Sequence, residues 1–140
     1  MFWRPRVPTG PGIEITVDVA EARAYDYFEQ VRADEVTLEP NDFLLGETAE
    51  AMGLPQHLAG LIEGKSGRAR HGLIVHCTAP HIAPGWGAVR PKRITLELAN
   101  LGPVPLKLKA GIGIAQLLVL RLGSPSLVQY AGRHLALGGG

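Results

Sequence analysis

Apolar and polar residues alternate along several short stretches of the chain, which is the pattern of a strand with one buried face. The clearest alternation runs over residues 93–99. Leu96 belongs to its apolar face and Glu97 to the opposite face, because neighbouring side chains of a strand point in opposite directions. Residues 13–19 alternate in the same way. Shorter apolar runs predict further strands at 43–46, 59–63, 73–76, 104–108 and 112–120.

The stretches between these runs are rich in turn-forming residues. The chain of 140 residues holds 18 glycines and 11 prolines, spread along its length. This distribution favours an all-β sandwich or jelly-roll-like barrel and argues against a helical bundle. A chain of this length suits one domain with one core. We therefore expect a single domain over residues 1–140, with an irregular arm at 1–11, a helical turn or two within 21–31, a turn at 40–42 and a flexible tail at 131–140.

Charge and cysteine content narrow the classes of function. The formal net charge is +1, so the electrostatics of the whole molecule do not indicate a nucleic acid or a membrane as partner. The single cysteine, Cys77, excludes an internal disulfide framework and a zinc site built from cysteines. No apolar stretch has the length of a transmembrane helix, and no signal peptide opens the sequence, which predicts a cytoplasmic protein.

Five segments carry most of the chemistry-bearing residues. They are EPNDFLLG at 39–46, EGKSGRARHGL at 63–73, VHCTAPHIAPGW at 75–86, TLELAN at 95–100 and GIGIAQL at 111–117. In sequence and in order, these segments resemble the motifs of dCTP deaminases. The chain is therefore similar to the dCTP deaminase family, within the dCTP deaminase/dUTPase superfamily.

The resemblance implies a fold, an assembly and a type of site. The fold would be all-β, a distorted jelly-roll or β-clip barrel like that of dUTPase. Three copies of the chain would form a homotrimer, with each active site built from neighbouring chains. The substrate would be a pyrimidine deoxynucleoside triphosphate that carries its own Mg²⁺, and no metal would be bound by the protein. A glutamate would shuttle protons while a water attacks C4 of the base.

Four residues match the catalytic positions of the resemblance: Glu97, Arg70, Ser66 and Ala79. Leucines flank Glu97, so burial is expected to raise the pKa of its carboxyl, which suits a group that accepts and returns a proton. The pattern alone favours a solvated glutamate on the outer face of a strand, and the motif reverses that preference. Arg70 would orient the glutamate, or it is a surface arginine. Ser66 and the carbonyl of Ala79 would hold the water.

The segment 63–73 also supplies residues expected to contact the nucleotide. Lys65 stands where the family usually has arginine, which keeps the charge but loses the bidentate fork. Gly67 replaces a serine, although its backbone N–H can still face an anion. Tyr130 lies either near the sugar and base or in a packing position near the C-terminus. The full set expected at the nucleotide is Lys65, Ser66, Gly67, Arg68, Arg70, Thr95, Leu96, Glu97, Gln116 and Tyr130.

Three histidines within eleven residues, His71, His76 and His81, suggest a metal site as an alternative. Their spacing places them on no common helical face, and no pattern of cysteines or carboxylates completes a zinc-binding set. His76 also matches a histidine of a buried strand in the family. The sequence therefore predicts no protein-bound metal.

Besides Lys65 and Gly67, the chain departs from the family at three places. Ala83 replaces an aspartate that activates water in the dUTPase branch and binds the sugar hydroxyl in both branches. Residues 88–93 add a basic loop, which either supplies charge to the site or is a solvated turn. The tail after Tyr130 lacks the lysine and glutamine that close the family's site, and a closing segment normally excludes water.

These observations leave three functions open. The first is a dCTP deaminase that converts dCTP to dUTP and ammonia. The second is a dUTP pyrophosphatase or a bifunctional enzyme, which Ala83 disfavours. The third is a non-catalytic homologue that binds a nucleotide or serves in assembly, which the departures at Lys65, Gly67, Ala83 and the tail favour.

Overall fold

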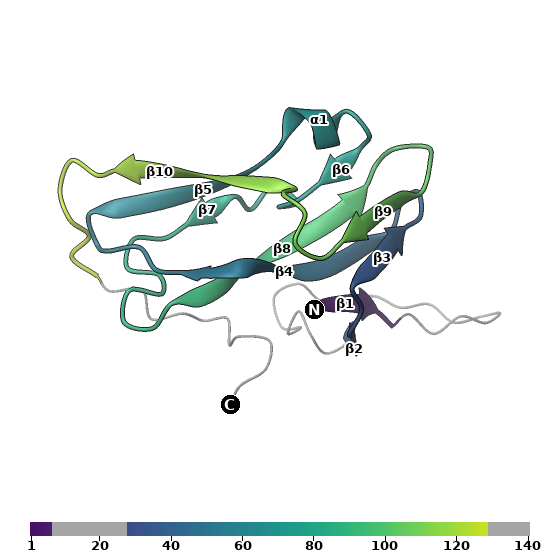
Figure 1. Cartoon of the computed structure of the whole chain (residues 1–140). Coiled ribbons are helices and arrows are strands. Elements are labelled where there is room, and N and C mark those ends of the chain that lie inside the picture. The colour runs from purple at the N-terminus through teal and green to yellow at the C-terminus, as the bar shows by residue number, and fades with distance from the viewer. Residues whose placement is uncertain (7–27, 129–140) are drawn as a thin grey trace, which may run out of the picture.

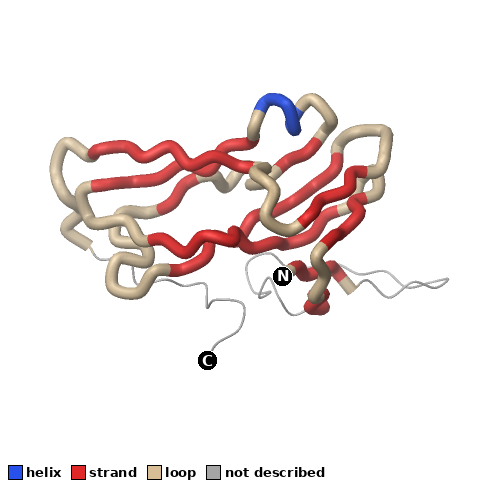
Figure 2. The backbone as a smooth tube through the Cα atoms, in the orientation of Figure 1, coloured by secondary structure: helices blue, strands red, loops and turns tan. Residues whose placement is uncertain are grey.

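The computed structural model describes residues 1–6 and 28–128, which fold almost entirely into β-strands (Figures 1 and 2). One helical turn is present in this part of the chain, α1 (Ser66–Ala69), between β5 and β6. The strands are β1 (Phe2–Pro5), β2 (Phe28–Val31), β3 (Glu35–Leu38), β4 (Phe43–Met52), β5 (Leu58–Gly64), β6 (Leu73–Ile74), β7 (His81–Ile82), β8 (Lys92–Asn100), β9 (Leu106–Lys109) and β10 (Ala115–Arg121).

The described strands are arranged in three sheets. The largest has the order β2-β1-β4-β8-β6, the second the order β10-β5-β7, and the third pairs β3 with β9. Figure 1 shows β10 and β5 running over the long strands β4 and β8, so that two layers face each other. The antiparallel pairing of β4 with β8 is interrupted by a bulge between Glu47 and Ala51.

The hydrophobic core lies between these layers and consists mainly of aliphatic side chains. Leu38, Leu44 and Leu98 are almost completely buried. Leu96 and Leu98 are both buried on β8, as the alternation predicts, and Glu97 between them lies on the other face of the strand. The core therefore fixes the side of β8 on which the Glu97 carboxyl lies.

Asn100, at the end of β8, has a fully buried polar side chain. Its Nδ2 donates hydrogen bonds to the carbonyl oxygens of Leu38 at 3.0 Å and Val104 at 2.8 Å. Its Oδ1 accepts a hydrogen bond from the backbone N–H of Gly102 at 2.9 Å. Both N–H groups and the oxygen are thus paired, as a buried amide requires. The side chain ties β8 to β3 and to the turn before β9.

Most expected strands are present, but their ends are shifted. The predictions at 59–63 and 93–99 are confirmed by β5 and β8. The strand expected at 43–46 continues to Met52, because its pairing with β8 resumes beyond the bulge. The strand expected at 73–76 ends at Ile74. β9 and β10 both begin two or more residues later than expected, and Gly111 at φ +80° turns the chain between them.

Three local features differ from the sequence predictions. Residues 1–11 were expected to be irregular, yet Phe2–Pro5 forms β1 because its two first side chains are buried and its backbone pairs with β2 and β4. Phe28–Val31 is a strand rather than a helical turn. Four residues of the polar segment after β5 form α1, which the sequence did not predict. The strand predicted at 13–19 and the tail at 131–140 lie outside the described residues.

We expect Asn100→Leu to lower the free energy of unfolding by about 3 kcal/mol or more, because it leaves two carbonyl oxygens and one N–H buried without partners. Urea denaturation monitored by circular dichroism measures this loss. Lys107→Ala is the matched control, since it removes only an exposed ion pair with Glu35 and should cost less than about 1 kcal/mol. Equal losses in the two variants would show that the Asn100 amide is not a structural tie.

Candidate functional site

A polar hollow of about 490 Å³ lies beside α1, at one end of the β5–β10 pair. Four of the residues predicted to contact the nucleotide line it: Lys65, Ser66, Gly67 and Gln116. Glu63 and His76, which the sequence analysis did not assign to the site, line it as well. The structure thus brings residues of the 63–73, 75–86 and 111–117 segments to one place.

The pairing of β5 with β10 brings the 63–73 segment beside the 111–117 segment. Gln116 lies opposite Glu63 in the antiparallel register, and the Gln116 Nε2 donates to the carbonyl oxygen of Gly64 at 3.2 Å. Beyond the strand ends, the Lys65 N–H donates to the carbonyl oxygen of Ile114 at 3.4 Å. A Cβ added at Gly113 would lie 3.2 Å from the Lys65 Nζ, so the end of the Lys65 side chain lies close to Gly113. The backbone therefore holds Lys65 beside Gln116.

The helical turn α1 presents its residues to solvent at the edge of the hollow. Ser66, Gly67 and Arg68 are all exposed. Within the turn, the first N–H to donate a hydrogen bond is that of Arg68, to the carbonyl oxygen of Lys65 at 2.8 Å. The N–H groups of Ser66 and Gly67 come before it in the chain and therefore have no acceptor within the turn. A Cβ at Gly67 would meet nothing within 4 Å. The space of the serine side chain that the family carries here is therefore open.

Glu97 lies next to His76, through an isolated parallel bridge between their backbones. Burial raises the pKa of the Glu97 carboxyl from its ordinary value, and the hydrogen bond to its own backbone and the charge of His76 oppose that rise. The expected desolvation of this carboxyl is therefore present. His76 both lines the hollow and lies beside Glu97, so it connects the two parts of the site.

Arg70 and Ala79 both lie at exposed positions of the described chain. Arg70 is exposed at the end of α1 and forms no ion pair with Glu97 or with any other acid of the described residues. The side chain whose electrostatic interaction lowers the pKa of the Glu97 carboxyl in this chain is instead that of His76. Ala79 is exposed, and its N–H donates to the carbonyl oxygen of His76 at 2.7 Å. The expected contact between Arg70 and Glu97 is not made within one chain.

The remaining predicted contacts divide into three cases. Leu96 is buried in the core, so its side chain does not reach the polar hollow. Thr95 is partly buried on the same strand face as Glu97. Tyr130 lies outside the described residues. The sequence missed Glu63 and His76 as hollow-lining residues, although both stand in the recognised segments and Glu63 directly precedes the glycine before Lys65.

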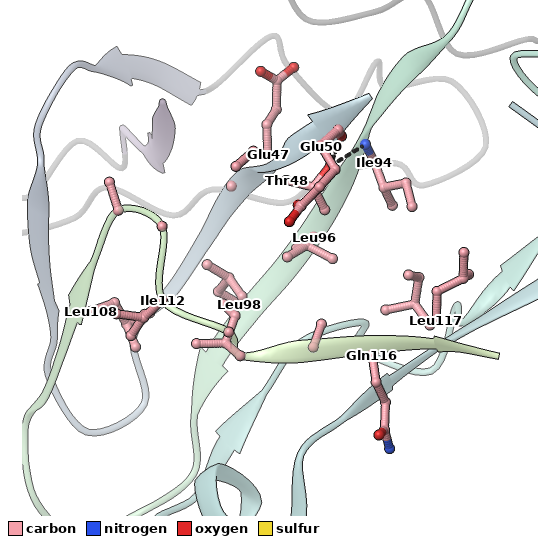
Figure 3. Close-up of a pocket in the computed structure, with 18 of the residues that line it drawn as sticks. Glu47, Thr48, Glu50, Ile94, Leu96, Leu98, Leu108, Ile112, Gln116 and Leu117 are labelled. Carbon is pink, nitrogen blue, oxygen red and sulfur yellow. Dashed lines mark hydrogen bonds between the residues drawn. The ribbon is translucent and has the colours of Figure 1, made fainter. Parts of the chain in front are cut away.

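A second hollow of about 390 Å³ lies on the other side of β10 and is mostly apolar. Figure 3 shows Leu96, Leu98 and Ile112 around it, while the labelled Gln116 side chain points to the opposite side of β10 from Leu117. Of the four predicted catalytic residues, Ser66 lines the polar hollow, and none lines this apolar hollow. The arrangement of polar and titratable groups therefore favours the polar hollow as the functional site.

Among residues 1–6 and 28–128, no three histidine, cysteine, aspartate or glutamate side chains lie close enough together to hold a metal ion. Within the same residues, no helix is long and apolar enough to cross a membrane.

Ala83, at the position of the family's aspartate, begins a turn in which the Trp86 N–H donates to its carbonyl oxygen at 3.1 Å. A methyl group there can neither activate water nor bind a hydroxyl.

Comparison with known proteins identifies the family of the chain. The model of the dCTP deaminase-like family matches residues 13–122. The chain belongs to the dCTP deaminase-like family. It is 45% identical over 102 residues to the protein named "dCTP deaminase, dUMP-forming" of Mycobacterium ulcerans and to that of Mycobacterium tuberculosis. Each alignment covers 73% of this chain and 52% of the relative, so the chain spans about half the length of these relatives.

Solved structures show the same fold. The 2′-deoxycytidine 5′-triphosphate deaminase of Agrobacterium tumefaciens superposes with a TM-score of 0.62 at 24% identity, over 76% of this chain and 32% of that one. The EIAV dUTPase superposes with a TM-score of 0.55 at 24% identity, over 82% and 92% of the two chains. The predicted dUTPase-like, all-β fold class of this dCTP deaminase-like protein is thereby confirmed.

We expect the stability conferred by Glu97 to depend on pH. Because its pKa is raised by folding, the stabilisation is complete below the unfolded-state pKa, about 4.3, and is lost as the pH rises through the folded-state pKa. Glu97→Gln has no titrating group at this position. The free energy of unfolding of the unchanged protein should therefore fall, relative to that of Glu97→Gln, as urea denaturation is repeated at increasing pH.

Glu35→Gln provides a control of opposite sign. The hydrogen bond from Lys107 lowers the pKa of the Glu35 carboxyl, so the unchanged protein should gain stability relative to this variant as the pH rises through the same region. The same pH trend in both variants would show that burial does not perturb Glu97 in the folded protein.

Proposed function

We propose that the protein deaminates dCTP by hydrolysis, giving dUTP and ammonia. The observation that carries this proposal is the partly buried carboxyl of Glu97, whose pKa is raised by burial, next to His76, which lines the polar hollow. Such a carboxyl is suited to take a proton from water and to return it at a pH near neutrality. Membership of the dCTP deaminase-like family supports the choice of reaction.

Glu97 would act as general base and then as general acid. Its carboxylate would take a proton from a water held by the Ser66 hydroxyl and the Ala79 carbonyl. The water oxygen would attack C4 of cytosine, and the ring nitrogen N3 would receive the proton. A second proton transfer through Glu97 would convert the amino group to ammonia, so that the C4–N bond breaks and the carbonyl of uracil remains.

The triphosphate would bind at the polar hollow, together with the Mg²⁺ that it carries. Lys65 would offer a positive charge. The N–H groups of Ser66 and Gly67 lie at the start of α1, before Arg68, whose N–H is the first to donate a hydrogen bond within the turn. Arg68 and Arg70 are exposed on the same turn. Gln116 lines the hollow from β10 and would contact the nucleotide.

A homotrimer with sites between chains accounts for the position of Arg70. Within one chain Arg70 does not reach Glu97, so an arginine that orients this glutamate would come from a neighbouring copy. β10 is the edge strand of its sheet, and its residues Leu118, Val119 and Leu120 are 42%, 51% and 45% exposed. An exposed apolar edge strand is suited to packing against another chain.

The identity of the product separates two candidate functions. The mycobacterial relatives are named dUMP-forming, which favours release of dUMP as a second candidate function. Ala83 offers no carboxyl to activate a water for attack on the phosphate chain, which favours dUTP as the end product. The two candidates differ in whether the triphosphate survives.

Incubation of the purified chain with dCTP and Mg²⁺, followed by anion-exchange chromatography, should yield dUTP. Glu97→Ala should lower the rate by a factor of at least about a hundred, because general acid–base catalysis is lost. Lys107→Ala, which removes only an exposed ion pair with Glu35, is the control and should keep the rate of the unchanged protein. Formation of dUMP from dCTP would replace the first product by the second. Binding of dCTP without any turnover would contradict an enzymatic role and favour a nucleotide-binding homologue.

Mixed trimers test whether each site uses two chains. Arg70→Ala and Glu97→Ala chains, each inactive alone, should regain activity when they are co-expressed, because some sites combine an intact Arg70 with an intact Glu97. Random mixing of equal amounts would restore about a quarter of the sites. If mixed trimers form but stay inactive, both residues act from the same chain and the assembly proposed for the site is wrong.

A further inference from the structure

The segment that follows β6 contains a strained turn. Cys77 and Thr78 have φ values of +35° and +73°, and the Ala79 N–H donates to the carbonyl oxygen of His76 at 2.7 Å. Two successive left-handed residues closed by this hydrogen bond make a turn of type I′, which glycine and asparagine normally occupy. A β-branched residue such as Thr78 is rarely found there. The turn therefore needs support from its surroundings.

The imidazole of His76 gives that support. Its Nδ1 accepts a hydrogen bond from the backbone N–H of Thr78 at 3.1 Å. In a neutral imidazole one nitrogen accepts and the other carries the proton, so the proton of His76 belongs on Nε2. The Nε2 faces the carboxylate of Glu63, with 3.7 Å between Nε2 and Oε2. Glu63 thus favours the tautomer that the turn requires.

This turn begins directly beside the proposed catalytic glutamate. His76 forms the backbone bridge with Glu97, and the Cys77 Sγ lies 3.6 Å from the Glu97 carbonyl oxygen. The charged groups around His76 come from different elements: Glu63 from β5, Glu97 from β8 and Lys65 from the start of α1. The His76 side chain is 25% exposed and lines the polar hollow, unlike a histidine that only fills a core.

We propose that His76 is a positioning residue that holds the 76–79 turn through Nδ1, and that Glu63 keeps its ring in the required tautomer. The turn then presents the Ala79 carbonyl, which would hold the attacking water, beside Glu97. This role deepens the proposed deamination and rests on it. Because the turn positions the water rather than the triphosphate, its loss should lower kcat and leave the KM for dCTP nearly unchanged.

Two amide substitutions separate the two nitrogens of His76. In His76→Asn the side-chain oxygen can take the place of Nδ1 and accept the Thr78 N–H. In His76→Gln the amide reaches the place of Nε2 and the acceptor for Thr78 is lost. We expect kcat of His76→Asn to exceed that of His76→Gln by at least about tenfold, with KM values within about threefold of each other. Equal kcat values, or a difference confined to KM, would overturn the proposal.

A measurement without substrate tests the tautomer separately. The ¹⁵N chemical shifts of the neutral His76 ring should show the proton on Nε2 in the unchanged protein. In Glu63→Gln they should show an increased share of the Nδ1–H form, together with a lower kcat. Two results would overturn the role given to His76 and Glu63: a proton on Nδ1 in the unchanged protein, or the same share of the two tautomers in Glu63→Gln as in the unchanged protein.

The two measurements also separate this inference from the proposed function. If the unchanged protein does not deaminate dCTP, the proposed function fails, while the nitrogen shifts still decide whether Glu63 and the turn fix the ring. If deamination is observed but His76→Asn and His76→Gln behave alike, the positioning role fails and the function stands. Circular dichroism and thermal unfolding of each variant ensure that only folded proteins are compared.

Discussion

The buried amide of Asn100 is the interaction on which the geometry of the site most depends. At the end of β8, this amide donates to the carbonyl oxygens of Leu38 and Val104 and accepts from the N–H of Gly102. In addition, the backbone N–H and carbonyl of Asn100 pair with the turn at residues 41–42. The end of β8 is thereby fixed to β3, to the turn that precedes β4 and to the turn before β9. Glu97 stands three residues before this anchor, so its depth in the protein follows from it.

Periodicity predicted the part of the site that depends on a single strand. The alternation over 93–99 places Leu96 and Leu98 in the core and Glu97 on the opposite face, and the structure has this arrangement. One strand contains all the information needed for that result, since the pleat reverses direction at every residue. The raised pKa of Glu97 does not follow from this pattern, because the flanking leucines point to the opposite face of the strand and the burial of the carboxyl comes from other parts of the fold.

The other part of the site depends on contacts between strands, which no local pattern contains. The approach of His76 to Glu63 requires the chain to leave β5, form α1 and return through β6. The left-handed turn at Cys77 and Thr78 was not predictable, since neither residue type favours it. The role expected for Arg70 came from resemblance, and a single chain cannot reproduce a contact that two chains would make.

The edge position of β10 has a consequence for how the protein is made. In the proposed homotrimer, a newly synthesised chain would expose Leu118, Val119 and Leu120 until it met its partners, on a strand that lies at an edge of its sheet among the described residues. Such a strand can pair with any other unpaired strand in its surroundings. Assembly of the proposed homotrimer and incorrect association would therefore use the same surface. At a high local concentration of new chains, the relative rates of the two processes, and not the stability of the final products, would decide which one occurs.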